Sequence, residues 1–219
     1  MSNSLLTNAQ TLAQEFSQRS DEFEGARRLP ADVSKAMAHA GIYRMFVPKT
    51  LGGSETSPMI SSEVFETLAQ GDAACAWVAF IAATSGSALA RIESSVARQM
   101  FNTPDTMIAG VFAPNGKAIK AEDDYVLNGH WQWGSGTQNA DWVLAGSLLI
   151  DPQQSSDTKP RAHMCLVPQN SVEFLDTWHS SGLKGTGSTD FRINNCRIPS
   201  AHIVGLEVDK MPDTPLFQF

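Results

Sequence analysis

The feature of this sequence that most constrains its fold is a change of hydrophobic pattern near residue 104. Before that point, apolar residues recur at the three- and four-residue spacing of amphipathic helices. After it, short runs rich in Val, Ile, Trp and Phe follow one another without helical segments between them. Such an order does not suit a parallel sheet built from strand–helix–strand units. We therefore predict an α+β chain, with a helical N-terminal domain over 1–104 and a middle β domain over 105–219 that is an antiparallel β-sandwich or barrel.

The helices of the first part are delimited by residues that favour helix ends. Pro30 begins a helix that Gly41 ends, which is the usual order of these two residues. Ser57 and Pro58 begin another helix. Asp72 is predicted to cap the next helix, because its carboxylate can accept hydrogen bonds from the free N–H groups of the first turn.

The helix from Asp72 to about Leu89 is apolar on nearly all sides and rich in small residues, so we predict that it is buried. Thr84 and Ser85 are its polar interruptions. An interior hydroxyl more often bonds back to its own helix than to a ligand. In the β part, Asn115-Gly116 and Asn128-Gly129 are predicted to be turns between strands.

Composition excludes several classes of function. The chain of 219 residues has a net charge of -7 and no cluster of basic residues, so a nucleic-acid partner is not expected. The 3 cysteines and 5 histidines are scattered and match no disulfide or metal-ligand spacing. The longest apolar run, 73–83, is shorter than the ~20 residues that cross a membrane. The polar N-terminus resembles no secretory signal, so we expect a cytoplasmic protein without a membrane partner.

Residues 130–136, His-Trp-Gln-Trp-Gly-Ser-Gly, are the most informative stretch of the β part. If they form a strand, Trp131, Trp133 and Ser135 share one face, because side chains alternate along a strand. A flat indole beside a hydroxyl would suit a planar heteroaromatic ring with a polar edge. From the pattern alone, the more usual interpretation is that the tryptophans fill a β core, because Trp is mostly buried. If they are exposed, they could instead bind a sugar.

The glycine-rich stretch 182–188, Gly-Leu-Lys-Gly-Thr-Gly-Ser, allows two interpretations. Its glycines and hydroxyls could form a nest for a phosphate, or they could form a tight turn between strands. A strand-like pattern follows it, so it is not a dinucleotide-binding loop that opens a helix. The sequence has no GxSxG, HExxH or Walker motif, and the catalytic residues are unknown at this stage.

In their order and spacing, several short motifs resemble the acyl-CoA dehydrogenase superfamily, including the related flavin-dependent two-component monooxygenases. The motifs are Leu51-Gly52-Gly53 after Val47-Pro48, Ala76-Trp77, Gly110-Val111-Phe112-Ala113-Pro114, Trp133-Gly134-Ser135-Gly136 followed by Ala140-Asp141-Trp142, and Trp178 with Gly182-Leu183-Lys184-Gly185-Thr186-Gly187-Ser188 before Arg197-Ile198-Pro199. The resemblance covers the N-terminal and middle domains of that superfamily.

The resemblance implies a flavin, FAD more than FMN, in a crevice between the β domain and a third, helical domain. By similarity, Trp133 lies beside the isoalloxazine ring and Ser135 bonds its N5 edge, while the backbone of the first strand supports the pyrimidine side. The implied cofactor-binding residues are Val111, Phe112, Ala113, Trp133, Gly134 and Ser135. Where several monooxygenases have a functional His on the small-residue helix, this chain has Thr84 and Ser85, which we expect near the substrate.

The reaction implied first is acyl-CoA dehydrogenase-type oxidation of a small-molecule, acyl-CoA-like substrate by a flavin-dependent oxidoreductase. The alternative is a reduced-flavin-dependent monooxygenase that hydroxylates an aromatic or heteroatom substrate and depends on a flavin reductase. A second alternative is a non-catalytic remnant or assembly module. Phe219 lies about where the third domain begins in the family, so we expect a truncated chain of weak activity, which would be a homo-oligomer at full length.

Overall fold

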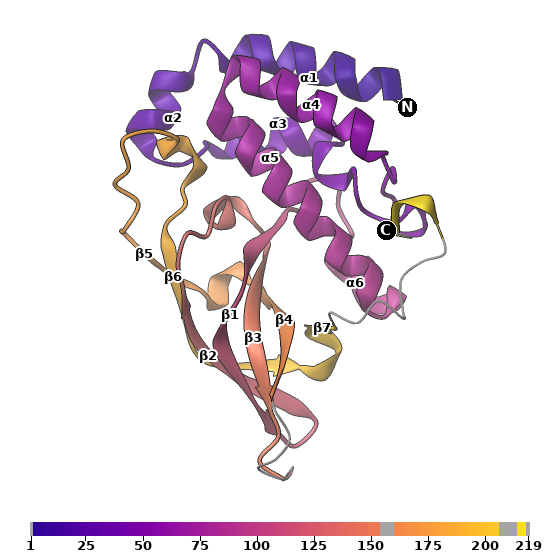
Figure 1. Ribbon diagram of the computed structural model, residues 1–219, viewed down its shortest axis with the longest axis vertical. Helices are drawn as coiled ribbons and strands as arrows, with labels where there is room; N and C mark the ends of the chain where they lie inside the picture. Colours follow the sequence, from indigo (N-terminus) through magenta and orange to yellow (C-terminus); the bar gives the residue numbers. More distant parts are fainter. Residues whose placement is uncertain (1, 154–159, 206–213, 218–219) are drawn as a thin grey trace.

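The computed structural model describes residues 2–153, 160–205 and 214–217. Helices occupy one end of the molecule and a sheet the other, and α5 crosses from the helical layer down toward the sheet (Figure 1). The α+β order predicted from the sequence is confirmed: helices come first and strands follow directly on one another.

The α-helices among the described residues are α1 (Ser2–Phe16), α2 (Ser20–Ala26), α3 (Ala31–His39), α4 (Pro58–Gly71), α5 (Ala73–Gly86) and α6 (Ser94–Met100). Helices α3, α4 and α5 begin where the sequence predicted, at Pro30, Ser57 and Asp72 or the residue that follows each. Asp72 Oδ1 accepts from the Cys75 N–H at 2.9 Å, so the predicted cap is present. Ser57 Oγ also accepts from the Ile60 N–H, at 3.4 Å, and caps α4. The short helix α2 was not predicted.

The Asp72 cap gives a first testable prediction. Asp72→Ala is expected to lower the free energy of unfolding by about 1 kcal/mol, because the Cys75 N–H loses its acceptor at the start of α5. Asp72→Asn keeps an acceptor oxygen and should retain most of the stability. Urea unfolding followed by circular dichroism measures both variants, and equal losses for Ala and Asn would show that the cap is not the cause.

Helix α5 is the centre of the helical core, as its composition predicted. Cys75, Val78 and Ala79 are among its buried residues, and they pack with side chains of α1, α3 and α4. By length and composition alone, the stretch Ala73–Arg91 could also cross a membrane, but 61% of the tested window is buried within the protein. A buried core helix passes the same test.

The sheet has seven strands among the described residues, in the order β5-β6-β2-β1-β3-β4-β7. They are β1 (Ile108–Ala121), β2 (Asp124–Trp131), β3 (Trp142–Ile150), β4 (Arg161–Pro168), β5 (Glu173–Leu175), β6 (Asp190–Pro199) and β7 (Ile203–Val204). Neighbours pair antiparallel except β1 and β3, which run parallel. The parallel pair arises because the chain leaves β2 and crosses to the other side of β1, where Trp142 pairs beside Ile108.

The two turns predicted at Asn-Gly pairs are wrong, since both pairs lie inside strands. Gly116 of β1 pairs with Gly129 of β2, and a Cβ added at either position would lie 2.3 or 2.5 Å from the Trp131 ring. These glycines therefore make room for an indole rather than reverse the chain. The reversal between β1 and β2 comes later, where Glu122 takes a left-handed conformation with φ 58°.

The boundary expected at residue 104 lies in the segment between α6 and β1. Arg44 ties this segment to the helical part, because its guanidinium donates to the carbonyl oxygens of Phe101 and Thr103 and lies 4.4 Å from the Phe101 ring centroid. Met107 and Ala109 pack into the helical core as well. The division into two domains at this point stays a prediction.

Candidate functional site

Trp131 and Trp133 have opposite environments, so the predicted strand with both indoles and Ser135 on one face is wrong. Strand β2 ends at Trp131, whose side chain is fully buried and stacks on Phe191 with ring centroids 5.1 Å apart. Trp133 is 70% exposed and has φ 61°. A non-glycine residue in the left-handed region cannot continue a strand, so the alternation stops after Trp131.

The turn that follows β2 is fixed to the glycine-rich loop of residues 182–188. The Gly134 N–H donates to the Thr189 carbonyl at 2.9 Å, and the Gly136 N–H donates to the Thr186 carbonyl at 2.9 Å. Gly136 has φ 71°, which favours glycine, and a Cβ there would lie 2.9 Å from Met107. Two segments that are about fifty residues apart in sequence therefore form one wall.

A chain of hydroxyl groups joins this wall to α5. The Trp77 indole N–H donates to Ser135 Oγ at 3.0 Å, and Ser135 Oγ lies 2.6 Å from Ser188 Oγ. Ser188 Oγ lies 2.6 Å from Thr186 Oγ1, which in turn lies 2.8 Å from the Leu183 carbonyl oxygen. Ser135, Ser188 and Thr186 are all buried.

The two ends of this hydroxyl chain fix the direction of its hydrogen bonds. A carbonyl oxygen only accepts, so Thr186 donates its proton to Leu183 and must accept from Ser188. Ser188 has then used its proton and must accept from Ser135. Ser135 accepts from the Trp77 N–H and donates to Ser188, so its remaining capacity is a single acceptor lone pair.

A shallow pocket of about 160 Å³ opens beside this chain. Its lining includes Trp133 and Ser188, so the exposed indole and the hydroxyl chain meet at one surface. The rest of the lining is Thr177, Trp178, His179, Ser180 and Asp190. The Asp190 carboxylate lies 3.0 Å from His130 Nε2. The backbone N–H of Asp190 donates to Thr177 Oγ1 at 2.8 Å, so it is not free to bind a ligand in the pocket.

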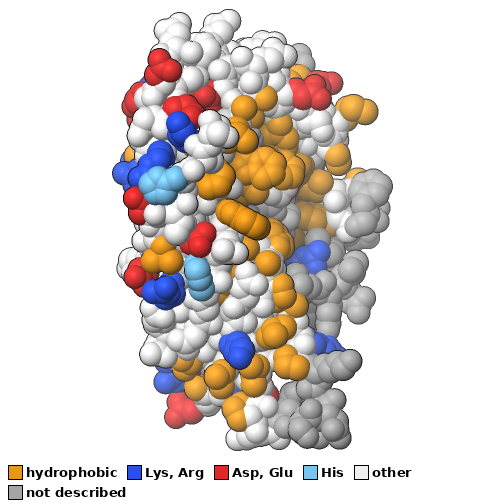
Figure 2. All heavy atoms as spheres, turned by 60° about the vertical axis from the view of Figure 1, so that its left-hand side comes forward, with side chains coloured by type: hydrophobic (Ala, Val, Ile, Leu, Met, Phe, Trp, Pro, Cys, Tyr) orange, Lys and Arg blue, Asp and Glu red, His pale blue; other side chains and the backbone are white. Residues whose placement is uncertain are grey.

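Exposed aromatic side chains continue from this pocket onto α5. Trp77 is 44% exposed and stacks on Phe80 with ring centroids 5.6 Å apart. Figure 2 shows hydrophobic side chains gathered in a band on one face of the molecule, from its upper part to its lower end. Aromatic groups left exposed beside a polar pocket are typical of a surface that binds a planar ligand.

The segment Val111–Ala113 lies in β1, where the pairing with β3 is irregular between Val111 and Gly116. Val111 is half-buried, Phe112 is 55% exposed and Ala113 is exposed. Within the described residues, no hydrogen bond or ring contact joins this segment to Trp133, Gly134 or Ser135. Its cofactor role stays a prediction.

Thr84 and Ser85 lie on different sides of α5. Thr84 follows Trp77 and Phe80 at helical spacing and is half-buried, and its hydroxyl donates to the Phe80 carbonyl at 2.7 Å. Ser85 is 1% exposed, and its hydroxyl has no hydrogen-bond partner among the described residues. Thr84 therefore shares the helix face of Trp77, whereas Ser85 does not reach the surface; the substrate role of both stays a prediction.

Three N–H groups of the glycine-rich loop are bound within the protein and are not free for a phosphate. The Lys184 N–H donates to Glu24 Oε1 at 2.9 Å, and the N–H groups of Thr186 and Gly187 donate to carbonyls within the loop at 3.1 Å. Leu183 and Gly187 have left-handed φ angles of 54° and 56°. Of the two interpretations left open by the sequence, the geometry favours the tight turn.

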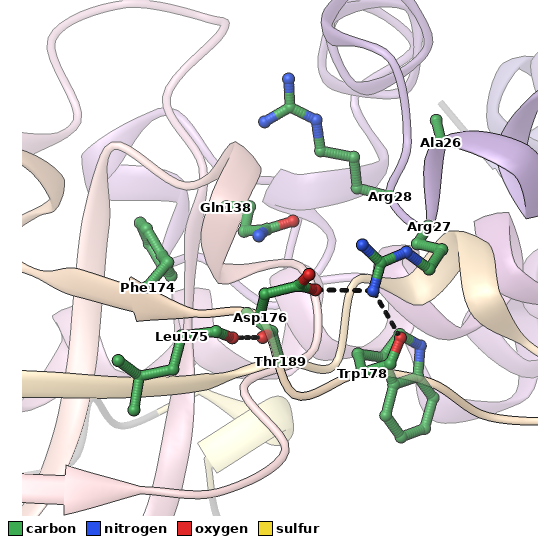
Figure 3. Close-up of a pocket in the computed structure, with 9 residues that line it drawn as sticks. All are labelled: Ala26, Arg27, Arg28, Gln138, Phe174, Leu175, Asp176, Trp178 and Thr189. Carbon is green, nitrogen blue, oxygen red and sulfur yellow. Dashed lines mark hydrogen bonds and ion pairs between the residues drawn. The ribbon is translucent and has the colours of Figure 1, made fainter.

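A second pocket, of about 290 Å³, also has Trp178 in its lining (Figure 3). Arg27 and Asp176, two of the charged residues that line it, are bound to each other at 2.6 Å. This hydrogen bond lowers the pKa of Asp176 and raises that of Arg27. The pair is therefore charged near neutral pH and holds two parts of the chain together.

The described residues contain no group of three or more His, Cys, Asp or Glu side chains that could hold a metal ion. Burial raises the pKa of the Cys165 thiol to about 11 and raises that of Cys75 even further. Neither thiol is a ready nucleophile, because the thiolate is the reactive form.

Sequence reasoning missed several residues of this site. Trp77 and Trp178 were noted as parts of motifs without a role, and Thr177, His179 and Asp190 were not assigned. The signal that could have found the last three is their position a few residues before or after the glycine-rich loop. Their approach to Trp133 depends on tertiary structure and is not visible in a spacing.

Comparisons with known proteins show which family the chain resembles. The family described as acyl-CoA dehydrogenase, N-terminal domain, matches residues 4–100. Indole-3-acetate monooxygenase of Acinetobacter baumannii is 32% identical over 84% of this chain and 47% of its own length. The oxygenase subunit HsaA of a flavin-dependent monooxygenase of Mycobacterium tuberculosis is 28% identical over 90% of this chain and 49% of its own length.

Solved structures show the same relationship. The crystal structure of the HsaA monooxygenase from M. tuberculosis has a TM-score of 0.84 at 27% identity, over 92% of this chain and 55% of that one. XiaF from Streptomyces sp., in complex with FADH2 and glycerol, has a TM-score of 0.82 at 26% identity, over 94% of this chain and 52% of that one. The chain spans about half the length of the curated relatives it matches. The family match, these relatives and the shared fold place the chain in the acyl-CoA dehydrogenase superfamily, where it corresponds to the helical N-terminal and middle β domains.

Proposed function

We propose that this chain forms the flavin-binding part of the oxygenase component of a reduced-flavin-dependent monooxygenase. The proposal is supported most directly by the hydroxyl chain, which leaves Ser135 with an acceptor lone pair and no free proton. N5 of an oxidised flavin is a hydrogen-bond acceptor, whereas N5–H of a reduced flavin is a donor. A Ser135 that can only accept is therefore matched to the reduced form.

The residues of the pocket suit a flavin in their chemistry. An exposed indole suits a planar tricyclic ring, and Trp133 contributes a large flat surface with few rotatable bonds. Its left-handed backbone conformation holds the side chain out of the β core, which Trp131 occupies instead. Non-glycine residues with a strained backbone conformation are often found at ligand-binding sites.

Each of the chain's own residues has a distinct task in this proposal. Trp133 would bind the ring face, Ser135 would orient the N5 edge, and Ser188 would accept the Ser135 proton and so keep Ser135 an acceptor toward the ligand. A bound reduced flavin supplies the two electrons that the reaction uses with molecular oxygen. The buried hydroxyl chain contains no carboxylate or imidazole, so it holds protons in place and does not act as a general base.

Acyl-CoA oxidation, the reaction that the sequence suggested first, is the weaker proposal. A dehydrogenase begins its cycle with an oxidised flavin, whose N5 needs a donor where Ser135 offers only an acceptor. The relatives described above are named as monooxygenases. For the same reason, a flavin reductase that supplies reduced flavin is the partner we propose.

FAD and FMN share the isoalloxazine ring that the proposed contacts recognise, so the site itself does not choose between them. XiaF was crystallised with FADH2. The earlier expectation of FAD over FMN is therefore not part of the proposal. The substrate is proposed only as a small aromatic or heteroatom-containing molecule.

The proposal is tested by titrating the 219-residue chain with FMN and FAD, each oxidised and each reduced under anaerobic conditions. We expect the reduced form to bind about tenfold more tightly, which corresponds to one hydrogen bond of ~1.4 kcal/mol. Tighter binding of the oxidised form, or bleaching of the oxidised flavin by an added acyl-CoA, would favour the dehydrogenase instead. Absence of any flavin binding would favour the non-catalytic remnant.

Trp133→Ala is expected to weaken binding of either flavin by about tenfold, because the ring face loses a stacking partner worth ~1 kcal/mol or more. Trp133→Phe retains an aromatic ring and should lose less. Quenching of flavin fluorescence gives the dissociation constants. An unchanged constant for Trp133→Ala would place the flavin elsewhere.

A further inference from the structure

The loop between β5 and β6, residues 176–189, forms most of the polar wall of the Trp133 pocket. It contributes Thr177, Trp178, His179 and Ser180 to the lining and, near its end, Ser188 of the hydroxyl chain. Apart from one short 3-10 turn at Lys184–Thr186, it has no regular secondary structure. A loop of this length is held in one conformation only by contacts with other parts of the chain.

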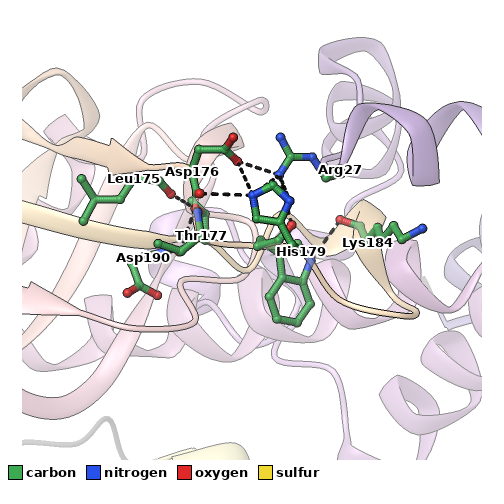
Figure 4. Close-up of polar contacts among 9 residues, drawn as sticks. Arg27, Leu175, Asp176, Thr177, His179, Lys184 and Asp190 are labelled. Atoms are coloured by element: carbon green, nitrogen blue, oxygen red, sulfur yellow. Dashed lines mark hydrogen bonds and ion pairs between the residues drawn. The ribbon is translucent and has the colours of Figure 1, made fainter.

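Those contacts come from α2 in the helical part. Figure 1 shows this loop lying beside α2, well away from the middle of the sheet. Arg27, the residue after α2, donates from Nη1 to Asp176 Oδ1 at 2.6 Å and to the Trp178 carbonyl at 3.2 Å. The same nitrogen lies 3.2 Å from the ring nitrogens of His179 (Figure 4).

Glu24 holds the second half of the same loop. Its Oε1 accepts from the Lys184 N–H at 2.9 Å, and its Oε2 lies 3.7 Å from Lys184 Nζ. Next to this contact, a Cβ added at Gly185 would lie 2.9 Å from Phe23 Cβ and 3.1 Å from Ala74 Cβ. The loop therefore lies directly against α2, with a polar contact on each side of its bend.

Inside the loop, Trp178 connects the two halves. Its indole N–H donates to the carbonyls of Leu183 and Lys184 at 3.3 and 3.2 Å, while its own carbonyl accepts from Arg27. Thr186 then donates to Leu183 and accepts from Ser188, as derived above. Arg27 and Glu24 are therefore connected to the hydroxyl chain by hydrogen bonds: they bind Trp178 and Lys184, and both Trp178 and Thr186 donate to the Leu183 carbonyl.

We propose that Glu24 and Arg27 are positioning residues for the flavin site: they hold the 176–189 loop so that its pocket-lining residues and Ser188 keep their places beside Trp133. The proposal rests on the proposed function for the identity of the ligand. Neither residue lines the Trp133 pocket. They act from a helix that the sequence did not predict.

We expect these contacts to hold the loop in one conformation, with little effect on the free energy of unfolding of the whole chain. The Arg27 side chain is 34% exposed and that of Asp176 is 70% exposed, and such surface ion pairs contribute little to unfolding free energy. A purely structural role would change the melting temperature. A positioning role changes ligand binding and local exchange while the melting temperature stays nearly constant.

The test compares Arg27→Met with Arg28→Gln in the 219-residue chain. Met keeps the length of the side chain but removes every donor, whereas Arg28 has no hydrogen bond or ion pair to another described residue and serves as the matched control. We expect Arg27→Met to raise the dissociation constant for reduced flavin about tenfold, the size of a lost charged hydrogen bond. Amide hydrogen exchange over residues 176–189 should become faster in the same variant.

Two further variants separate the proposed contact from a general loss of charge. Asp176→Ala removes the carboxylate but leaves the Arg27 hydrogen bond to the Trp178 carbonyl, so it should reproduce part of the effect of Arg27→Met. The double variant should be no worse than Arg27→Met alone, because that variant already lacks the ion pair. Arg27→Lys keeps a charged donor and should restore most of the binding. Glu24→Ala should loosen the second half of the loop independently.

The outcomes distinguish this proposal from the proposed function. Wild-type exchange rates and an unchanged flavin dissociation constant in Arg27→Met would overturn the positioning role, even if the chain binds reduced flavin. If the wild-type chain binds no flavin, the proposed function fails, and the exchange rates alone decide whether Arg27 orders the loop. Equal effects of Arg27→Met and Arg28→Gln would also overturn the proposal.

Discussion

Trp131→Ala is expected to lower the free energy of unfolding by about 3–5 kcal/mol, the usual loss for a large aromatic residue removed from a core. Trp131 is fully buried and stacks on Phe191, and its indole N–H donates to the Gly146 carbonyl at 2.7 Å. Gly116 and Gly129 approach its ring so closely that no other side chain fits there. The variant therefore leaves a cavity and a buried carbonyl without its donor.

Trp133→Ala is the matched control, because it removes the same side chain two positions later. Its indole is 70% exposed, so the unfolding free energy should change by less than about 1 kcal/mol. Urea denaturation of the two variants gives both values. Similar losses would contradict the separation of the two tryptophans into a core residue and a pocket residue, as would a stable Trp131→Ala.

The helical part could be predicted from the sequence because its signals are local. Pro30, Ser57 and Asp72 act on the helix that directly follows each of them, and the structure places those helices as expected. Helix α2 was missed because it has only 7 residues and a single buried one, Phe23. A segment this short has no periodicity to read.

The site could be predicted only in part, because its geometry depends on residues far apart in the sequence. The expected alternation of side chains along a strand ends before Trp133. The left-handed backbone conformation of Trp133 interrupts the strand, so its indole is exposed while that of Trp131 is buried. The exposed indole and Ser135 meet instead through Ser188, which belongs to a loop about fifty residues further on. Local patterns cannot reveal such a contact.

The Asn-Gly pairs illustrate the same limit within the sheet. In isolation, Asn128-Gly129 is a strong signal for a hairpin turn. In the folded chain, the need to accommodate the Trp131 ring outweighs it, and Gly129 lies inside β2 opposite Gly116. A glycine can provide space as well as conformational freedom, and the sequence alone does not say which is used.

The direction of the hydroxyl chain leads to the second large effect. Ser188→Ala removes the group that accepts the Ser135 proton, so Ser135 becomes free to donate to a ligand. The ratio of the dissociation constants for oxidised and reduced flavin, which we expect to be about ten in the wild type, should fall to about one. Thr186→Val should relax the preference in the same direction, because Ser188 then loses its own acceptor.

Two control variants show whether polarity of the chain, rather than a local change of shape, sets this preference. Ser188→Thr keeps the hydroxyl and should keep the preference for reduced flavin. Trp77→Phe removes the indole N–H but leaves Ser135 donating to Ser188, so the preference should also persist while overall affinity changes. Anaerobic titrations with oxidised and dithionite-reduced flavin measure each ratio. If Ser188→Ala retained the wild-type ratio, the redox state of the bound flavin would be selected by groups other than this hydroxyl chain, and the strongest structural argument for a monooxygenase over a dehydrogenase would be lost.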